Sequence, residues 1–412
     1  MKKLLTIFLS MLLVISVSGC AGSSTTTKKT TEKVNLQMWH YYNDTKSKNT
    51  IQNFCDQYNK QSKVASVKAV SLAFADFKKQ LSISAAASSL PDVVMIDNCD
   101  NTAYSAMGMF SDLTSFVKTW PDYEKYYDWA KKTGQYKGKI YGIPFDGNCL
   151  GIMYNKQMFR DAGITSTPKT WDELRADAKK LTKSGVAGFI MCAAKNEEGT
   201  SQFDPWLWSA GGSEYHMTSP DSLRALTFLY NMVKDGSMPT DIINWSQSEL
   251  LSQFESGKTA MMEEGSWDLD NLKTDCKFEW GCFQIPKDKY SVDVLGGENL
   301  AIVKGKNVEA SFDFMKYVLK TENVVQWTKS TSQFPERSDS IEDSRFSETE
   351  NWKMFKDIFK TTTRSRPVDT AYPQISSGVQ LALQEALSLQ KSPEQAVKDG
   401  QALIDQAVAN RK

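Results

Sequence analysis

The chain has 412 residues, of which 41% are hydrophobic and 24% charged, with 49 Lys and Arg against 49 Asp and Glu. This composition is typical of a soluble globular protein, and the length exceeds that of one ordinary domain. The balanced charge excludes the strongly basic surface on which nucleic-acid binding depends, so we expect no nucleic-acid partner.

The N-terminal segment predicts export. Two lysines precede an apolar run, Leu4 to Val17, which is shorter than the roughly 20 residues of a membrane-spanning helix. Small residues then lead to Cys20, in a pattern that resembles the lipobox of bacterial lipoproteins. We therefore expect a signal peptide over 1–20, lipidation of Cys20 and a flexible tether over 21–33. The expected location is extracytoplasmic, on the outer face of a Gram-positive-type cell membrane, with the lipid anchor as the only membrane contact.

Strand and helix patterns alternate along the rest of the chain and predict an α/β fold. The expected strands are 34–38, 67–72, 91–97, 151–154 and 189–193, and the expected helices are 46–60, 74–84, 171–184, 223–234 and one near the C-terminus. Thr170 and Glu173 have the spacing of a capping box, and Ser392 begins the last helix with a similar signal. We expect Asp100 to cap a helix that begins near Asn101.

Motifs for catalysis and metal binding are absent from the sequence. His40 and His216 belong to no HExxH pattern, and neither GxSxG nor GxGxxG occurs. The segment 257–259 resembles the end of a P-loop, but Ser252 stands where that motif requires glycine. These observations predict a protein that is not an enzyme and that holds neither a cofactor nor a metal.

The cysteines and the acidic pairs leave alternatives open. No CxxC pair occurs among the cysteines that remain after Cys20, so both a disulfide between Cys276 and Cys282 and free buried thiols are possible. These cysteines are Cys55, Cys99, Cys149, Cys192, Cys276 and Cys282. Glu263 and Glu264 are adjacent and would point to opposite faces of a strand, so they cannot flank one glycosidic bond. A pair of Asp146 with Glu264 or Glu298 keeps a glycoside hydrolase open as an alternative.

Several motifs resemble those of family 1 of the extracellular solute-binding proteins, the maltose-binding-protein-like receptors of ABC importers. The motifs, in the order of that family, are YGIPF (141–145), YNK (154–156), PKTWDEL (168–174), FESGKTAMMEEGSW (254–267), GGENLAIVKGKNVEASFDFMKYV (296–318), QFPER (333–337) and YPQISSGVQLALQEAL (372–387). The likeness spans residues 34–408.

This resemblance implies a two-lobe periplasmic-binding-protein-like fold of type II. Each lobe would be a mostly parallel sheet flanked by helices, with a solute cleft between the lobes. Lobe one would comprise 34–146 and 300–343, and lobe two 147–299 and 344–412. The implied protein is a monomer that captures a sugar by hinge closure and delivers it to a permease served by a separate ATPase. A polyamine as the solute and a surface adhesin are further alternatives.

A sugar site needs aromatic platforms and a few fixed polar groups. The aromatic candidates are Tyr41, Tyr42, Trp206, Trp208, Trp245 and Trp267. The polar candidates are Asp97, Asn98, Asp146, Asn148, Glu264, Glu298, Arg337 and Arg366. The resemblance favours Trp267 as the stacking platform and Asn148 as a polar contact, and core packing is the alternative for each aromatic residue.

Overall fold

The computed structural model describes residues 33–346 and 349–411, so the predicted signal peptide, Cys20 and nearly all of the predicted tether lie outside the described residues. Its larger sheet has six strands, in the order β11–β10–β3–β1–β2, with β6 paired to β10. These strands are β1 (Val34–His40), β2 (Ala65–Ser71), β3 (Val93–Asp97), β6 (Gly142–Asn148), β10 (Asp293–Ile302) and β11 (Thr363–Ser365).

The strands of this sheet meet in a mixed pattern. β1 is parallel to β2 and β3, whereas β10 is antiparallel to both β3 and β6. All ten residues of β10 are buried. Strands covered on both faces lose the alternation of polar and apolar residues, as β3 also shows.

A smaller sheet has the order β8–β7–β9, and both of its pairings are antiparallel. Its strands are β7 (Leu150–Asn155), β8 (Met261–Gly265) and β9 (Trp280–Phe283). The segment 189–193, predicted as a strand, joins β8 only through an isolated parallel bridge between Ile190 and Met262. It is not a regular strand because the amides of Phe189 and Ala193 donate to the carbonyl oxygens of Ser237 and Ile242, which lie outside the sheet.

The strands and helices divide into two groups, which we call lobe one and lobe two. Lobe one holds β1, β2, β3, β6 and the hairpin β4 (Gln135–Tyr136) and β5 (Lys139–Ile140). Its helices are α1 (Thr45–Gln61), α2 (Phe74–Ala86), α3 (Asn101–Ala106), α4 (Thr114–Val117), η1 (Pro121–Lys125), α5 (Asp128–Thr133), α12 (Val308–Val318) and α13 (Thr321–Thr331). Two hydrophobic clusters form its core.

Lobe two holds β7, β8, β9 and β11 around the largest hydrophobic cluster. Its helices are α6 (Lys156–Asp161), α7 (Trp171–Leu181), α8 (Glu197–Ala210), α9 (Pro220–Lys234), η2 (Thr240–Ile243), α10 (Gln247–Glu255), η3 (Ser266–Asp268), α11 (Leu269–Asp275), α14 (Glu350–Thr361), α15 (Tyr372–Leu387) and α16 (Pro393–Ala409). Among the described residues, no helix combines the length and hydropathy that crossing a bilayer requires.

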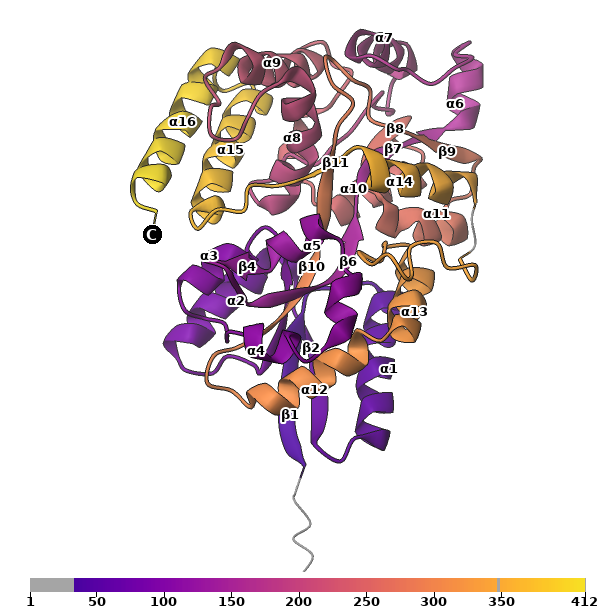
Figure 1. Cartoon of the computed structure of the whole chain (residues 1–412). Helices are drawn as coiled ribbons and strands as arrows, with labels where there is room; N and C mark the ends of the chain where they lie inside the picture. The colour runs from indigo at the N-terminus through magenta and orange to yellow at the C-terminus, as the bar shows by residue number, and fades with distance from the viewer. Residues whose placement is uncertain (1–32, 347–348, 412) are drawn as a thin grey trace, which may run out of the picture. The chain divides into compact units, whose positions relative to one another are not determined.

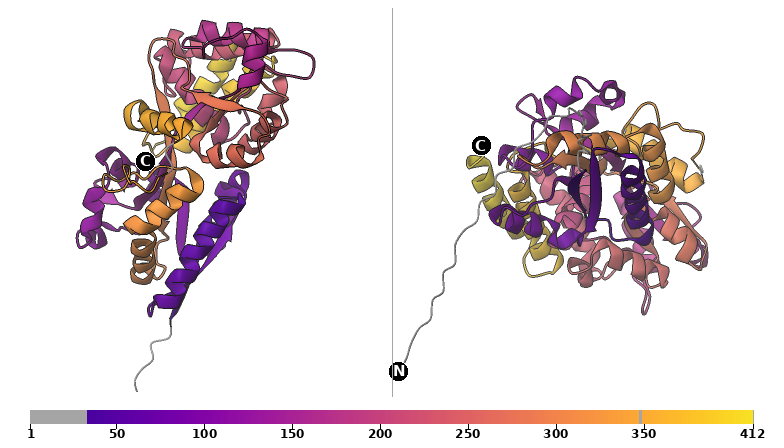
Figure 2. Two further views of the ribbon diagram at one scale, coloured as in Figure 1. Left: turned by 90° about the vertical axis from the view of Figure 1, so that its right-hand side faces the viewer. Right: turned by 90° about the horizontal axis from the view of Figure 1, so that it is seen from below.

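β10 and β6 connect the two lobes. Figure 1 shows β10 running from among the lobe-one strands up to β11, with β6 beside it, and the left view of Figure 2 shows the indigo N-terminal elements of lobe one below this crossing. β10 pairs with β11 at its start and with β6 and β3 at its end. The lobes are therefore joined by hydrogen-bonded strands, although the predicted lobe boundaries remain a prediction.

Local signals read from the sequence are confirmed at several helix ends. Thr170 and Glu173 form the predicted capping box of α7, and the Ser392 side chain accepts from the amide of Gln395 at the start of α16. α3 begins at Asn101, as expected, but Asp100 makes no side-chain cap, because its carboxylate is engaged by Lys78 at 2.6 Å instead.

The crossing of β6 and β10 leaves very little space around Gly297. Gly297 has φ +134, and a Cβ there would lie 2.2 Å from the backbone oxygen of Asp146. Backbone atoms of a paired strand cannot move aside in the way that a flexible side chain can. Glycine at this position therefore sets how closely β6 and β10 approach each other.

We expect Gly297→Ala to lower the free energy of unfolding by about 2–5 kcal/mol, because backbone strain and overpacking add. Gly108→Ala is the matched control, since Gly108 also has positive φ, at +77, but a Cβ there would meet nothing within 4 Å. That control should lose only about 1–2 kcal/mol. Urea unfolding of both variants measures the difference, and equal losses would contradict the proposed packing constraint.

Candidate functional site

A cavity of about 440 Å³ lies between the lobes, next to the crossing strands. Lobe one contributes Tyr41, Tyr42, Asn43, Asp44, Lys46, Ser47, Phe74 and Asp97, with Ser330, Thr331 and Gln333 from the end of α13 and the turn after it. Lobe two contributes Leu150, Glu197, Glu198, Ser201, Gln247, Ser248, Leu251, Trp267, Asp268, Asp270, Asn271 and Arg366. The crossing contributes Asn148, Val294, Gly296, Gly297 and Glu298. The wall thus combines aromatic faces with many hydrogen-bonding groups.

Tyr41 and Tyr42 follow β1 and present their hydroxyls to a pair of acids at the crossing. Tyr41 donates to Glu298 at 2.9 Å, and Tyr42 lies 2.6 Å from Glu298 and 2.8 Å from Asp146. The Tyr41 ring is held edge-on by Phe74, with the ring centroids 4.9 Å apart. Burial raises the pKa of both tyrosines well above the ordinary value, so the hydroxyls remain protonated donors.

Glu298 and Asp146 share one buried hydrogen-bonded arrangement. Burial, and after it the charge of Asp146, raises the pKa of Glu298 well above its usual range. Asp146 accepts from the indole of Trp327 and from the amide of Glu298, the latter at 3.1 Å. The geometry suits a proton on Glu298 that is donated to Asp146, because two adjacent carboxylates cannot both be ionised cheaply in a buried site.

Arg366 connects the lobes at another part of the wall. Its guanidinium contacts Asp97 of lobe one at 3.1 Å and Glu197 of lobe two at 2.8 Å. Tyr372 and Ser376 of α15 also donate to Glu197, at 2.5 and 2.7 Å. Burial opposes the charge on Arg366, but Asp97 and its other acidic neighbours hold its pKa above the ordinary value.

Asp97, Cys99 and Asp100 form a cluster whose donor atoms lie within 4.8 Å of one another. The cluster does not fit a metal site, because Arg366 contacts Asp97 and Lys78 contacts Asp100. Burial also raises the pKa of the Cys99 thiol well above its ordinary value, so a thiolate ligand is disfavoured. In the described part of the chain the cysteines are free thiols, including Cys276 and Cys282.

Trp267 lies on η3, directly after β8, and is partly exposed at the cavity. A Cβ on Gly265 would fall 2.1 Å from the Trp267 ring. The absence of that atom therefore lets the indole lie against the backbone at the end of β8. A flat aromatic face held in this way is suited to the C–H face of a sugar ring.

The structure brings seven of the fourteen predicted site residues to the cavity wall. They are Tyr41, Tyr42, Asp97, Asn148, Trp267, Glu298 and Arg366. Asp146 and Asn98 lie directly behind this wall rather than on it. Asp146 supports Tyr42, and the Asn98 side-chain oxygen accepts from Arg366 at 3.3 Å.

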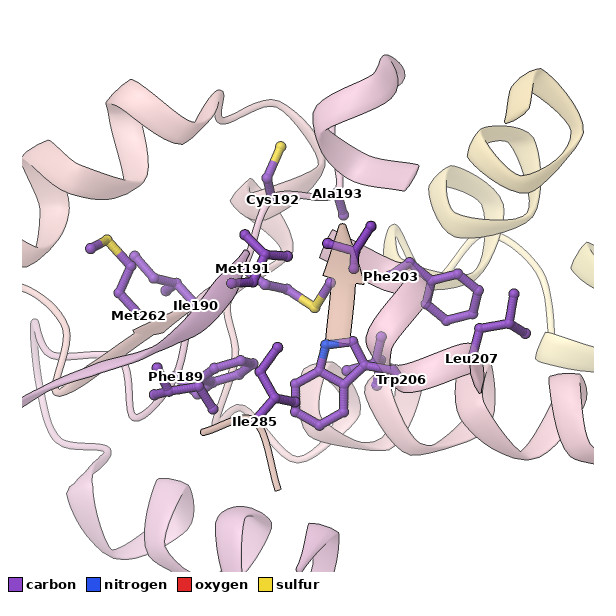
Figure 3. Close-up of a cluster of buried hydrophobic side chains, with 14 of the residues drawn as sticks. Phe189, Ile190, Met191, Cys192, Ala193, Phe203, Trp206, Leu207, Met262 and Ile285 are labelled. Atoms are coloured by element: carbon purple, nitrogen blue, oxygen red, sulfur yellow. The ribbon is translucent and has the colours of Figure 1, made fainter. Parts of the chain in front are cut away.

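The other tryptophan candidates need correction, because Trp206 and Trp208 belong to the lobe-two core and the half-buried Trp245 lies against it. Trp206 is fully buried among Phe189 and Ile285 (Figure 3). Its indole N–H donates to Glu263 at 2.7 Å. Trp208 is buried too, and its indole donates to Glu214 at 3.1 Å. Trp245 packs against the same cluster. None of these three rings reaches the cavity wall in the described structure.

Glu264 and Arg337 also lie away from the cavity wall. Glu264 is fully buried on β8 and accepts from the amide of Gly265 at 3.0 Å. Arg337 is fully buried in lobe one, where it pairs with Asp339 at 2.8 Å and lies over the Tyr126 ring. Arg337 thus has partners that account for its burial, whereas the second carboxyl oxygen of Glu264 is buried without a hydrogen-bond partner in the described structure.

Several wall residues were not anticipated from the sequence. They are Asn43, Asp44, Lys46, Ser47, Phe74, Leu150, Glu197, Glu198, Ser201, Gln247, Ser248, Leu251, Asp268, Asp270, Asn271, Val294, Gly296, Gly297, Ser330, Thr331 and Gln333. Two signals could have found some of them. Asp268 directly follows Trp267, and Glu197 and Glu198 begin a helix capped by Asn196, where acidic residues are favoured.

Comparison with known proteins places these observations in a family. A model of the bacterial extracellular solute-binding proteins matches residues 53–356. The multiple sugar-binding protein of Streptococcus mutans is 28% identical over 251 residues, which are 56% of this chain and 58% of that protein. The sn-glycerol-3-phosphate-binding periplasmic protein UgpB of Escherichia coli K12 is 25% identical over 252 residues, 56% of this chain and 55% of that protein. The chain thus spans little more than half the length of these two relatives.

Solved structures share the fold. The tagatose-bound ABC transporter solute-binding protein of Thermotoga lettingae matches with a TM-score of 0.84 and 23% identity, over 91% of this chain and 100% of that one. The GacH receptor of Streptomyces glaucescens, studied with acarbose, matches with a TM-score of 0.83 and 24% identity, over 92% and 100%. The predicted α/β fold with two lobes is therefore confirmed.

Arg366→Met should lower the free energy of unfolding by about 3–5 kcal/mol, because Asp97 and Glu197 would remain buried without their cation. Arg160→Met is the control. Its ion pair with Glu279 is about half exposed, and such pairs contribute at most about 1 kcal/mol. Chemical denaturation compares the two variants. A loss at Arg366 no larger than at Arg160 would contradict the role of the buried network.

Asp268 should make stability depend on pH. Burial, and then the charges of Glu255 and Asp44, raises its pKa from 3.8 to about 7, against a lowering hydrogen bond from Asn271. A carboxyl with a raised folded pKa contributes stability below its unfolded pKa and loses it as pH rises through the folded value. Between pH 4.5 and pH 8 the wild type should therefore lose more unfolding free energy than Asp268→Asn. Superimposable pH profiles would contradict this assignment.

Proposed function

Because the chain belongs to the bacterial extracellular solute-binding protein family, we propose that it is the solute receptor of an ABC importer and that its solute is a carbohydrate. The observation that carries this proposal is the cavity between the lobes, which has the Trp267 indole and several fixed polar groups on its wall. Sugars present flat C–H faces and hydroxyls, and these two kinds of surface match an indole and a set of oriented acceptors and donors.

The proposed mechanism is closure of the lobes around the solute. Residues of both lobes and of the crossing face the same cavity, so a solute that contacts all of them stabilises the closed arrangement by its differential affinity. Hinge movement at a few residues between domains is a common form of such closure. The glycines of β10 and the paired strands at the crossing are the natural place for it. A permease would then recognise the closed receptor, and a separate polypeptide would hydrolyse ATP.

A receptor role suits the acids of the site better than a hydrolase role. Glycosidases place two carboxyl groups on opposite sides of the scissile bond, about 5 Å or more apart. Here Asp146 and Glu298 are hydrogen-bonded to one another and share the Tyr42 hydroxyl. Glu263 and Glu264 are consecutive residues of β8, so their side chains point to opposite faces of the sheet, and both are fully buried. Neither pair has the required geometry.

Export and anchoring are part of the same proposal. An apolar run followed by a small-residue segment and Cys20 supports cleavage after residue 19 and lipidation of Cys20. The segment 21–33 would then connect the lipid to the two lobes. A receptor held at the outer face of the membrane stays close to its permease.

The test is a thermal-shift screen of the protein without residues 1–20, against sugars, polyamines, sugar phosphates and amino acids. A solute at about 100 times its dissociation constant stabilises the folded protein by about 2.7 kcal/mol. We expect a shift with carbohydrates that Trp267→Ala removes and Tyr290→Ala keeps, since Tyr290 is 58% exposed and outside the cavity. A shift with polyamines alone would replace the sugar as solute, and no shift with any compound would contradict the receptor role.

A further inference from the structure

The wall of the cavity carries far more negative than positive side chains. Two cations face it, Lys46 and Arg366. Seven carboxyl groups face it, namely Asp44, Asp97, Glu197, Glu198, Asp268, Asp270 and Glu298. This imbalance contrasts with the whole chain, in which acidic and basic residues are equal in number. The excess is therefore a local property of the site.

Both cations of the wall are already paired with acids. Arg366 lies between Asp97 and Glu197 and is buried with them. Lys46 of α1 reaches across the cleft to Asp270 of α11 at 3.1 Å. Neither cation is left over to balance an anionic solute. A phosphate or a sugar acid in this cavity would have to displace one of these pairs.

Four carboxyl groups have no cationic partner. Asp44 accepts from the amide of Ser47, and Glu198 from the side chain of Asn196. Asp268 accepts from Asn271, and Glu298 accepts from the two tyrosine hydroxyls and is hydrogen-bonded to Asp146. Among the residues that the structure describes, none of these four carboxyl groups forms an ion pair. A solute that fills the cavity also removes water from them, and an unpaired buried charge is costly.

Three of these acids have raised pKa values, as expected of buried carboxyl groups that have no cationic partner. Burial raises the pKa of Glu198, Asp268 and Glu298, in each case as the largest cause. An ammonium group placed among them would supply the opposite charge and offset the cost of ionising these buried groups. Charge-assisted hydrogen bonds of this kind are about twice as strong as neutral ones.

We propose that the solute is cationic, specifically a carbohydrate with a free amino group, such as an oligosaccharide of amino sugars. This inference rests on the proposed function and specifies its substrate class. Trp267 and Asp268 are neighbours on η3, so a sugar ring stacked on the indole has a carboxylate at hand for its amino group. Glu298 and Glu198 supply further acceptors on other parts of the wall. We expect the same arrangement to disfavour anionic solutes, including glycerol phosphate.

Three disaccharides with the same linkage test the charge directly. They are the β-1,4-linked dimer of glucosamine, the dimer of N-acetylglucosamine and cellobiose, which differ at the amino position. Isothermal titration calorimetry at low salt should give the glucosamine dimer an affinity at least about tenfold above either neutral dimer. Added salt should reduce that advantage, because it screens charge pairs.

Variants identify the acids that produce the selectivity. Asp268→Asn keeps the shape of the side chain and should reduce the affinity for the glucosamine dimer about tenfold, while the affinity for the neutral dimers changes little. Glu298→Gln is a second variant, for use if the first does not fold. Asp128→Asn removes an acid whose side chain is 92% exposed and outside the cavity, and it should change none of the affinities.

The outcomes separate this inference from the proposed function. Equal or tighter binding of a neutral dimer would overturn the cationic solute and leave the sugar receptor in place. Tight binding of glycerol phosphate alone would overturn both the cationic charge and the carbohydrate and would leave only the receptor role. Binding of spermidine without any carbohydrate would keep the charge preference but reject the sugar. No binding of any of these probes would overturn both.

Discussion

The burial of the Arg366 guanidinium is the constraint on which the site depends. A charge withdrawn from water needs opposite charges close by, and here they come from different lobes: Asp97 ends β3, and Glu197 begins α8. Charge compensation therefore fixes how the lobes meet along this side of the cavity. Tyr372 and Ser376 then satisfy the remaining acceptor positions of Glu197, which ties α15 to the same point. Asp97 and Glu197 thus already have their partners within the protein before any solute binds.

The other side of the cavity depends on the close approach of β6 and β10. Gly297 leaves room for the backbone of Asp146, and the register pairs Glu298 with Asp146 and with Asp97 on the other neighbouring strand. Three acids consequently lie at adjacent positions of one sheet. Arg366 neutralises Asp97, and the tyrosines after β1 donate to Glu298. The backbone geometry of the crossing thereby concentrates carboxyl groups at the point where the lobes join.

The sequence predicts the elements well where a local signal controls them. The capping box at Thr170 and the helices that begin after Asp44 and Ser392 depend on neighbouring residues. The strands that become β1, β2 and β3 are recognised from their own apolar residues. Prediction is weaker inside lobe two. α8 is buried over twelve of its fourteen residues, so helical periodicity cannot separate a core-facing tryptophan from one at the cavity. Trp206 lies in the buried α8 and Trp267 on η3 at the cavity, and Glu264 lies on a strand buried on both faces, where alternation carries no information.

Polar residues that serve the site are difficult to recognise because their partners are distant in sequence. Glu298 is connected to Tyr41 across 257 positions, and Arg366 to Asp97 across 269. Arg337 has the same residue type as Arg366 and is just as buried, but Asp339 and Asp122 satisfy it within lobe one. Which arginine faces the solute is therefore decided by which acids the fold brings to it.

The same reasoning applies to the acids: a carboxyl group with a nearby cation maintains the structure, whereas one without a cationic partner can accept a cation from a solute. Asp268 and Glu298 are of the second kind, and both lie on the wall of the cavity. Burial raises the pKa of both carboxyl groups, and an ammonium group from a solute would offset the cost of ionising them.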